Sequence, residues 1–133
     1  MAEIKSNEFK VSISASEVKE FLSDLNNIEQ LMPEDKIKDW KSGDNTCSFT
    51  IKGLSGIGMK RDDSSEVNGV HLVSHGKNPF DFTLDIIIND EGDSCSSQIV
   101  FDGNMNFMIQ TMAKGPLTAL FNIMGEKLVE RFS

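Results

Sequence analysis

The 133-residue chain contains no tyrosine and only three prolines, two cysteines and one tryptophan. Long apolar runs are missing as well, and the longest are triplets such as Ile86-Ile87-Ile88. A membrane-spanning helix needs about 20 consecutive, mostly apolar residues, so no membrane insertion is expected. The N-terminal segment Met-Ala-Glu-Ile-Lys-Ser lacks the apolar stretch of a secretory signal. We therefore expect a cytoplasmic protein.

Basic residues are scarce too: 13 lysines and arginines stand against 21 acidic residues, a formal net charge of -8. Nucleic-acid phosphates repel so acidic a protein, so no nucleic-acid partner is expected. Because no export signal is visible, Cys47 and Cys95 are expected to be reduced and packed rather than paired. The chain length fits one domain over residues 1–133. Nine phenylalanines and seven methionines predict an apolar interior with few polar groups.

The N-terminal third reads as a strand followed by two short helices. Residues 9–14 alternate between apolar and polar, which is typical of a half-buried strand. Ser14-Ala15-Ser16-Glu17 is a capping-box pattern, in which Glu17 reaches back to the amide of Ser14. Helical spacing then links the apolar residues of two short helices, the second ended by Pro33: Val18, Phe21, Leu22, Leu25, Ile28, Leu31 and Met32.

From residue 37 to 101 the apolar period changes to two, which predicts a run of strands. The clearest strand covers residues 80–88, and turn-forming sequences at 42–45, 68–69 and 89–93 separate the strands. Each strand has one apolar and one polar face. The pattern therefore predicts an antiparallel sheet of about seven strands that is covered on one side only.

A long C-terminal helix supplies the cover. Its apolar residues recur at helical spacing over roughly six turns: Ile109, Met112, Ala113, Leu117, Leu120, Phe121, Met124, Leu128 and Phe132. Pro116 is expected to bend this helix, because it cannot donate to the carbonyl four residues earlier. A strongly curved sheet around one helix is the simplest way to bury both apolar faces, so the fold class is α+β.

This order of elements resembles the helix-grip fold of the START and Bet v 1-like superfamily, also called the polyketide cyclase/dehydrase and lipid-transport superfamily. Residues 14–24 running into 27–33 carry the resemblance, because the superfamily has a helix entered from the first strand, a short second helix and a proline. Asn78-Pro79-Phe80-Asp81-Phe82 and the C-terminal helix look like its short stand-alone bacterial members. The likeness covers nearly the whole chain.

The resemblance implies a cavity between sheet and helix that binds a hydrophobic small molecule, lipid-like or polyketide-like, without a cofactor. The superfamily also includes cyclases and co-chaperone domains. A cyclase or dehydratase acting on an apolar substrate, or a module that binds a protein partner, therefore remains an alternative. The predicted ligand-binding residues face inward from the strands and from the helix: Phe49, Ile51, Phe82, Leu84, Ile99, Phe101, Met108, Met112, Leu120, Phe121 and Met124.

Methionines gather on or just before the long helix, at Met105, Met108, Met112 and Met124. Thioether side chains adapt to irregular surfaces, so they suit either a promiscuous apolar pocket or the filling of gaps in a core. The sequence leaves both readings open.

Four titratable residues on strands are candidates for a chemical role. His71 and His75 share one face of a strand, and their spacing would allow a metal site or a general base. That face is the polar one, and no third ligand is apparent. Asp81 and Asp85 also point away from the apolar side, and acid–base work by a carboxylate pair needs a burial that this pattern does not provide. The sequence therefore predicts no catalytic residue and no metal site.

Overall fold

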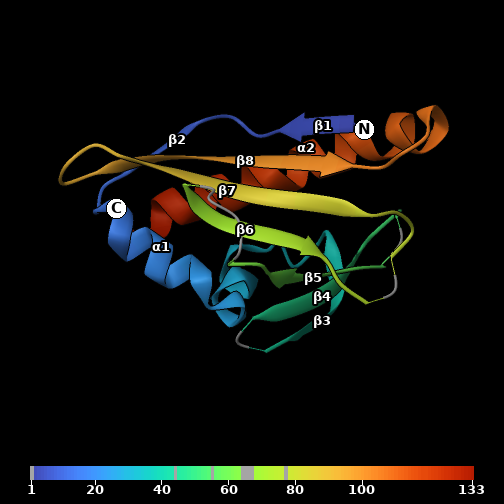
Figure 1. The fold of residues 1–133 in the computed structure, drawn as a ribbon, viewed down its shortest axis with the longest axis horizontal. Coiled ribbons are helices and arrows are strands. Elements are labelled where there is room, and N and C mark those ends of the chain that lie inside the picture. Colours follow the sequence, from blue (N-terminus) through green and yellow to red (C-terminus); the bar gives the residue numbers. More distant parts are fainter. Residues whose placement is uncertain (1, 44, 55, 64–67, 77) are drawn as a thin grey trace.

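The structure is a computed structural model that describes residues 2–43, 45–54, 56–63, 68–76 and 78–133. Asp44, which the sequence places in a turn, lies outside these residues. The described residues form one antiparallel sheet, two short helical segments and a long C-terminal helix (Figure 1). The predicted α+β architecture, a curved sheet around a long helix, is confirmed.

Eight strands make up the sheet within the described residues. They are β1 (Ala2–Lys5), β2 (Phe9–Val11), β3 (Ile37–Ser42), β4 (Thr46–Ile51), β5 (Gly56–Arg61), β6 (Gly69–Ser74), β7 (Phe82–Asp90) and β8 (Cys95–Gly103). Neighbours follow the order β1-β8-β7-β6-β5-β4-β3, and β2 also pairs with β8. Every pairing is antiparallel, as expected for strands joined by short turns.

Strands β7 and β8 form the longest pairing of the sheet, from Phe82 opposite Gly103 to Asp90 opposite Cys95. Along both strands, buried and half-buried residues alternate, as the period-two pattern predicts. The observed β7 begins at Phe82, two residues later than expected. The preceding Pro79 has no amide hydrogen to donate to a ladder, which favours a loop at this point.

Two strand segments, rather than one, open the chain. Both β1 and β2 pair with β8, and Ser6 lies between them. The amide of Ser6 donates to the carbonyl of Ile99, and the amide of Ile99 donates to the Ser6 hydroxyl, each at 2.9 Å. The buried Ser6 side chain therefore keeps the interrupted ladder hydrogen-bonded.

Strand β3 carries a bulge opposite β4. Lys38 pairs with Thr50 and Lys41 with Ser48, so two residues, Asp39 and Trp40, oppose one. Asp39 adopts a φ of 57°. As a result the indole of Trp40 turns inward and stacks on Phe49, with ring centroids 5.6 Å apart.

Helix α1 (Ala15–Ser23) and the 3₁₀ helix η1 (Leu25–Leu31) follow β2, as the apolar spacing predicts. The Ser14 hydroxyl accepts from the amide of Glu17 at 3.4 Å, which is half of the expected capping box. Val18 and Leu22 are fully buried, so α1 contributes one apolar face to the core. Pro33 follows η1 directly after its C-terminal cap, Met32.

Helix α2 (Phe107–Arg131) continues through Pro116. Asn106 caps its start, because its side-chain oxygen accepts from the amide of Ile109 at 2.9 Å. Gly115 precedes the proline and has no Cβ to clash with the proline ring, which keeps the helical conformation accessible there. The buried face of α2 packs into the curved sheet. In Figure 1 this helix lies behind strands β7 and β8.

Close contacts hold the C-terminal half of α2 in place. A Cβ built on Gly125 would lie 2.0 Å from Cε2 of Phe9, so the phenylalanine ring rests directly on the helix backbone. Phe132 meets Phe21 of α1 edge to face, with ring centroids 5.2 Å apart. The Lys127 ammonium donates to the carbonyl of Met32 at 3.2 Å. Both ends of the N-terminal segment from β2 to η1 are therefore tied to α2.

Candidate functional site: an apolar cavity at the N-terminal end of the long helix

A cavity of about 280 Å³ lies between the sheet and the N-terminal half of α2. It is enclosed by the end of β4 with the turn into β5, by β5 and β8 of the sheet, by the connection from β6 to β7, and by about three turns of α2. The lining residues are Ile51, Gly53, Leu54, Ile57, Pro79, Phe80, Phe101, Ile109, Met112, Ala113 and Leu117. All the described lining residues are apolar or glycine, so the walls offer apolar contact and few hydrogen bonds.

Exposure separates the floor of the cavity from its mouth. Five lining residues are buried and form the floor: Ile51, Ile57, Phe101, Ala113 and Leu117. At the mouth, Leu54, Phe80 and Ile109 are half-buried, and Met112 is 62% exposed. The opening to water therefore lies beside Met112, and the floor below it is lined by buried apolar side chains.

Aromatic side chains confine the cavity to one end of the space between sheet and helix. Phe82 stacks on Phe101 with ring centroids 5.1 Å apart, and Phe101 meets Phe121 of α2 at 5.7 Å. Phe80 contacts Phe101 edge to face at 6.1 Å. These rings fill the middle of the molecule. The open volume is left where α2 begins, beside the β4–β5 turn and the β6–β7 connection.

The eleven predicted ligand-binding residues fall into three groups. Ile51, Phe101 and Met112 line the cavity. Seven others are buried in the core: Phe49, Phe82, Leu84, Ile99, Leu120, Phe121 and Met124. Met108 is 71% exposed and lies one turn before Met112 on α2. The structure thus brings a minority of the predicted set together around open space.

Several lining residues were not among those predicted. Ile109, Ala113 and Leu117 were expected on the inward face of the helix, but helical spacing alone does not show which part of a helix borders a void. Leu54 and Pro79 lie in connections between strands, where the chain has no apolar period. No sequence signal marks such loop residues before their position in space is known.

The four titratable strand residues lie outside the lining of this cavity. His71 and Asp85 oppose each other on β6 and β7, and His71 Nδ1 contacts Asp85 Oδ1. Both belong to the outer face, as expected, yet their side chains are only 15% and 24% exposed. His75 and Asp81 are exposed. None of the four lines the apolar cavity.

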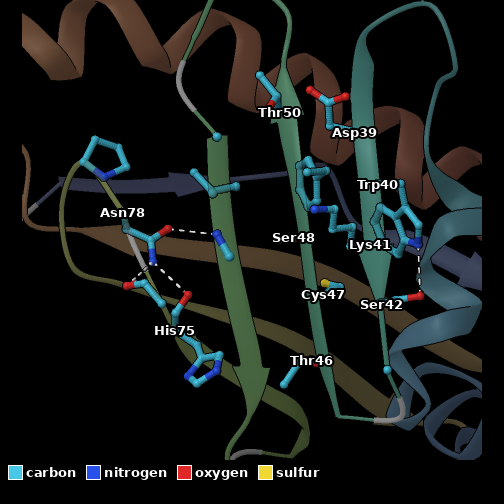
Figure 2. Close-up of a pocket in the computed structure, with 17 residues that line it drawn as sticks. Asp39, Trp40, Lys41, Ser42, Thr46, Cys47, Ser48, Thr50, His75 and Asn78 are labelled. Atoms are coloured by element: carbon cyan, nitrogen blue, oxygen red, sulfur yellow. Dashed lines mark hydrogen bonds between the residues drawn. The ribbon is translucent and has the colours of Figure 1, made fainter.

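A second, open hollow of about 1100 Å³ lies over β3, β4, β5 and the loop after β6 (Figure 2). Its polar side chains include those of Lys41, Thr46, Ser48, Thr50, His75 and Asn78. Ser48 faces Gly58 and Thr50 faces Gly56 across the β4–β5 pairing, so small residues leave the surface low there. The hollow is wide and its lining mixes polar with apolar side chains, which makes it a poorer match to an apolar ligand than the smaller cavity.

The Asn78 side chain links strand β5 to the loop after β6 by hydrogen bonds. Its side-chain oxygen accepts from the amide of Gly58 at 2.9 Å, and its side-chain nitrogen donates to the carbonyl of His75 at 3.1 Å (Figure 2). The pairing of β5 with β6 reaches only to Met59 opposite Ser74. The Asn78 amide therefore replaces a missing strand partner beside Ile57, which borders both pockets.

Both cysteines are buried and unpaired, as expected. Burial raises the pKa of the Cys47 thiol to about 12. The pKa of Cys95 is also raised, by burial first and then by the charges of Glu91 and Asp90. Neither thiol is therefore activated as a nucleophile near neutral pH.

The described residues were also compared with the requirements of a metal site and of a membrane-spanning helix. No group of three or more His, Cys, Asp or Glu side chains among them is arranged to hold a metal ion. No helix among them combines the length and the apolar character that a membrane crossing requires.

Comparisons with known proteins extend this picture at the level of the fold. The sequence matches no protein-family model. A search of curated proteins finds no match either. Solved structures do match: a START superfamily protein from Mycobacterium smegmatis superimposes with a TM-score of 0.68 at 17% identity, covering 98% of this chain and 99% of that one.

Two more structures agree over similar lengths. The KanY protein gives a TM-score of 0.75 at 12% identity, covering 99% of both chains. The XoxI protein from Bacillus cereus gives 0.70 at 11% identity, covering 99% of this chain and 96% of that one. At these identities the match concerns the fold. The resemblance seen in the sequence is confirmed at this level, and the chain has the fold of START superfamily proteins over nearly its whole length.

Proposed function

We propose that this protein binds a hydrophobic small molecule in the cavity at the N-terminal end of α2. The observation that carries the proposal is the cavity itself, about 280 Å³ of space with apolar walls, left open in an otherwise packed core. Natural cores contain few voids larger than a water molecule, so a void of this size favours a binding site over imperfect packing.

Three observations support this reading over a collapsed core. The floor residues come from β4, β5, β8 and α2, so the site is built by rigid elements rather than by one loop. Met112, which lines the cavity and is 62% exposed, marks where the cavity opens to water. The fold is that of START superfamily proteins, in which the space between sheet and helix generally takes hydrophobic ligands.

Affinity in such a site comes from apolar burial, about 25 cal/mol per Å² before ordering costs are subtracted. Because the walls supply few hydrogen-bonding groups, selectivity rests on size and shape. Ile51, Phe101 and Met112 are the predicted residues that contact the ligand, joined by Leu54, Ile57, Phe80, Ile109, Ala113 and Leu117. Phe82 and Phe121 support the site by packing on Phe101.

A fluorescence titration with an environment-sensitive naphthalene dye tests the proposal. The wild type is expected to bind the dye with an emission blue shift, and Ala113→Phe to abolish the signal by filling the floor. Ala119→Phe places the same ring on the exposed side of the same helix and should leave binding unchanged. Equal dye binding by all three proteins, with folds matched by circular dichroism, would show that the cavity is not the site.

A further inference from the structure

Building on the proposed function, we infer that the ligand buries one hydrocarbon tail of about nine carbons, inserted tail first, with its polar head left in water at Met112. The inference rests on three features of the cavity: its volume, the chemistry of its floor and the charge at its mouth. Each of them narrows the class of ligand independently.

Volume sets the length of the chain. A methylene group takes up about as much space as a water molecule does in the liquid, roughly 30 Å³. A cavity of about 280 Å³ therefore accommodates roughly nine methylene groups. A four-ring sterol, a multi-ring polyketide or a lipid with two long chains exceeds this volume and would require the Phe82–Phe101–Phe121 cluster to separate.

The floor sets the polarity of the buried end. Ile51, Ile57, Phe101, Ala113 and Leu117 present no side-chain donor or acceptor. A hydroxyl or carboxyl group pushed to this depth would lose its water without gaining a partner, which is costly. The buried end of the ligand is therefore the hydrocarbon tail.

The mouth sets where the head group stays. Met112 lines the cavity and is 62% exposed, so the opening to water lies beside it. Lys52, Asp81 and Lys114 each lie next to a lining residue in the sequence, and all three are exposed. Such charges of both signs in water select weakly between head groups. The chain, rather than the head, determines affinity.

Displacement of the naphthalene dye by straight-chain carboxylates of six to sixteen carbons, kept below their micelle concentrations, tests the inference. Affinity is expected to rise about fourfold per added methylene while each one enters the cavity. The gain should end near nine carbons, because further methylenes stay in water. Straight-chain alcohols should show the same gain in affinity per methylene and the same break point, which is the chain length at which the gain ends. A hydroxyl in the middle of the chain should remove most of the affinity.

Two variants move the break point in opposite directions. Ala113→Leu adds three carbons to the floor and should shorten the best chain by about three carbons, and Leu117→Ala should lengthen it by a similar number. Ala119→Leu, on the exposed side of α2, is the matched control with an unchanged break. The two floor variants are independent, so a folding defect in one leaves the other as the test.

The outcomes separate the inference from the proposed function. A break near nine carbons that shifts in the floor variants supports the inference. Three outcomes would overturn the inference and leave cavity binding intact. They are an affinity that rises steadily up to sixteen carbons, a break point that is the same in both floor variants and the wild type, and a dye that no chain displaces. Failure of dye and chains alike to bind would remove the proposed function as well.

Discussion

At the scale of single residues, Cys47 shows how burial alone determines whether a thiol ionises. Its thiol is 3% exposed on the inner face of β4, and the outer neighbours Thr46 and Ser48 are half-buried. Burial raises the pKa of the thiol from 9.0 to about 12, because the thiolate would lose its hydration. The residue therefore packs as a small apolar group.

This raised pKa predicts how stability responds to alkaline pH. Below pH 9 the Cys47 thiol is protonated in both states, so its contribution to the folded state is fully present. Between pH 9 and about 12 only the unfolded chain releases the proton, so the free energy of unfolding falls. Relative to Cys47→Ala, the wild type should lose about 1.4 kcal/mol per pH unit in this window.

Urea denaturation of both proteins from pH 8 to 10.5 provides the measurement. The Ala variant shares every other titrating group, including Cys95, so the difference between the two curves isolates Cys47. Parallel curves across this range would mean that the folded protein ionises the thiol as easily as the unfolded chain does.

At the scale of elements, the contact between β2 and α2 depends on the absence of one side chain. Three ring atoms of Phe9 lie 2.0 to 2.5 Å from the position that a Cβ on Gly125 would occupy. Glycine inside a helix normally costs about 1 kcal/mol relative to alanine. Here that cost is offset by an apolar contact that seats the C-terminal half of α2 against the first strands.

Gly125→Ala should therefore destabilise the wild type by about 1–3 kcal/mol, as overpacking does. In a Phe9→Ala background the ring is gone, and the same change should stabilise the protein by up to about 1 kcal/mol. Chemical denaturation of the four proteins of this double-mutant cycle measures the coupling. A gain in stability from Gly125→Ala in the wild type would show that the ring moves aside at no cost.

Local patterns were enough to predict the elements that bury one face along their whole length. Strand β7 follows its apolar period from Phe82, the buried residues of α2 recur at helical spacing from Ala113 to Leu128, and the Ser14 cap marks the start of α1. Strand β1 was not predicted, because a strand of four residues is too short to carry a clear apolar period. The bulge at Asp39 depends on the partner strand and is equally invisible in the sequence.

The candidate site was harder to predict than the fold. Inward-facing residues can be identified from alternation, but whether they pack together or border a void depends on their sizes in three dimensions. Phe82, Phe101 and Phe121 all face inward, and their rings fill the space that the predicted ligand would have occupied. The mouth includes Leu54, a loop residue that follows no period, and Phe80, which the period-two pattern placed in a strand but which lies in the loop before β7.

At the scale of the whole molecule, charge and apolar surface are unevenly distributed. The chain carries a formal charge of -8, yet residues 103–125 contain a single charged side chain, Lys114. Phe107, Met108 and Met112, at the start of α2, are 85%, 71% and 62% exposed. The surface that the start of α2 contributes beside the cavity mouth is therefore apolar, with Lys114 as its one charge, so an apolar molecule meets little competing hydration on that side.

The central claim is that the cavity at the start of α2 takes up an apolar molecule. A methyl-detected NMR titration with decanoate tests this claim most directly, because each wall carries methyl groups. The account predicts that the methyl signals of Ile51, Leu54, Ile57, Ile109 and Leu117 shift together, while those of Val18 and Ile4 stay in place. Unchanged signals at the floor, or shifts confined to outer-face methyls such as Ile87 and Val100, would contradict it.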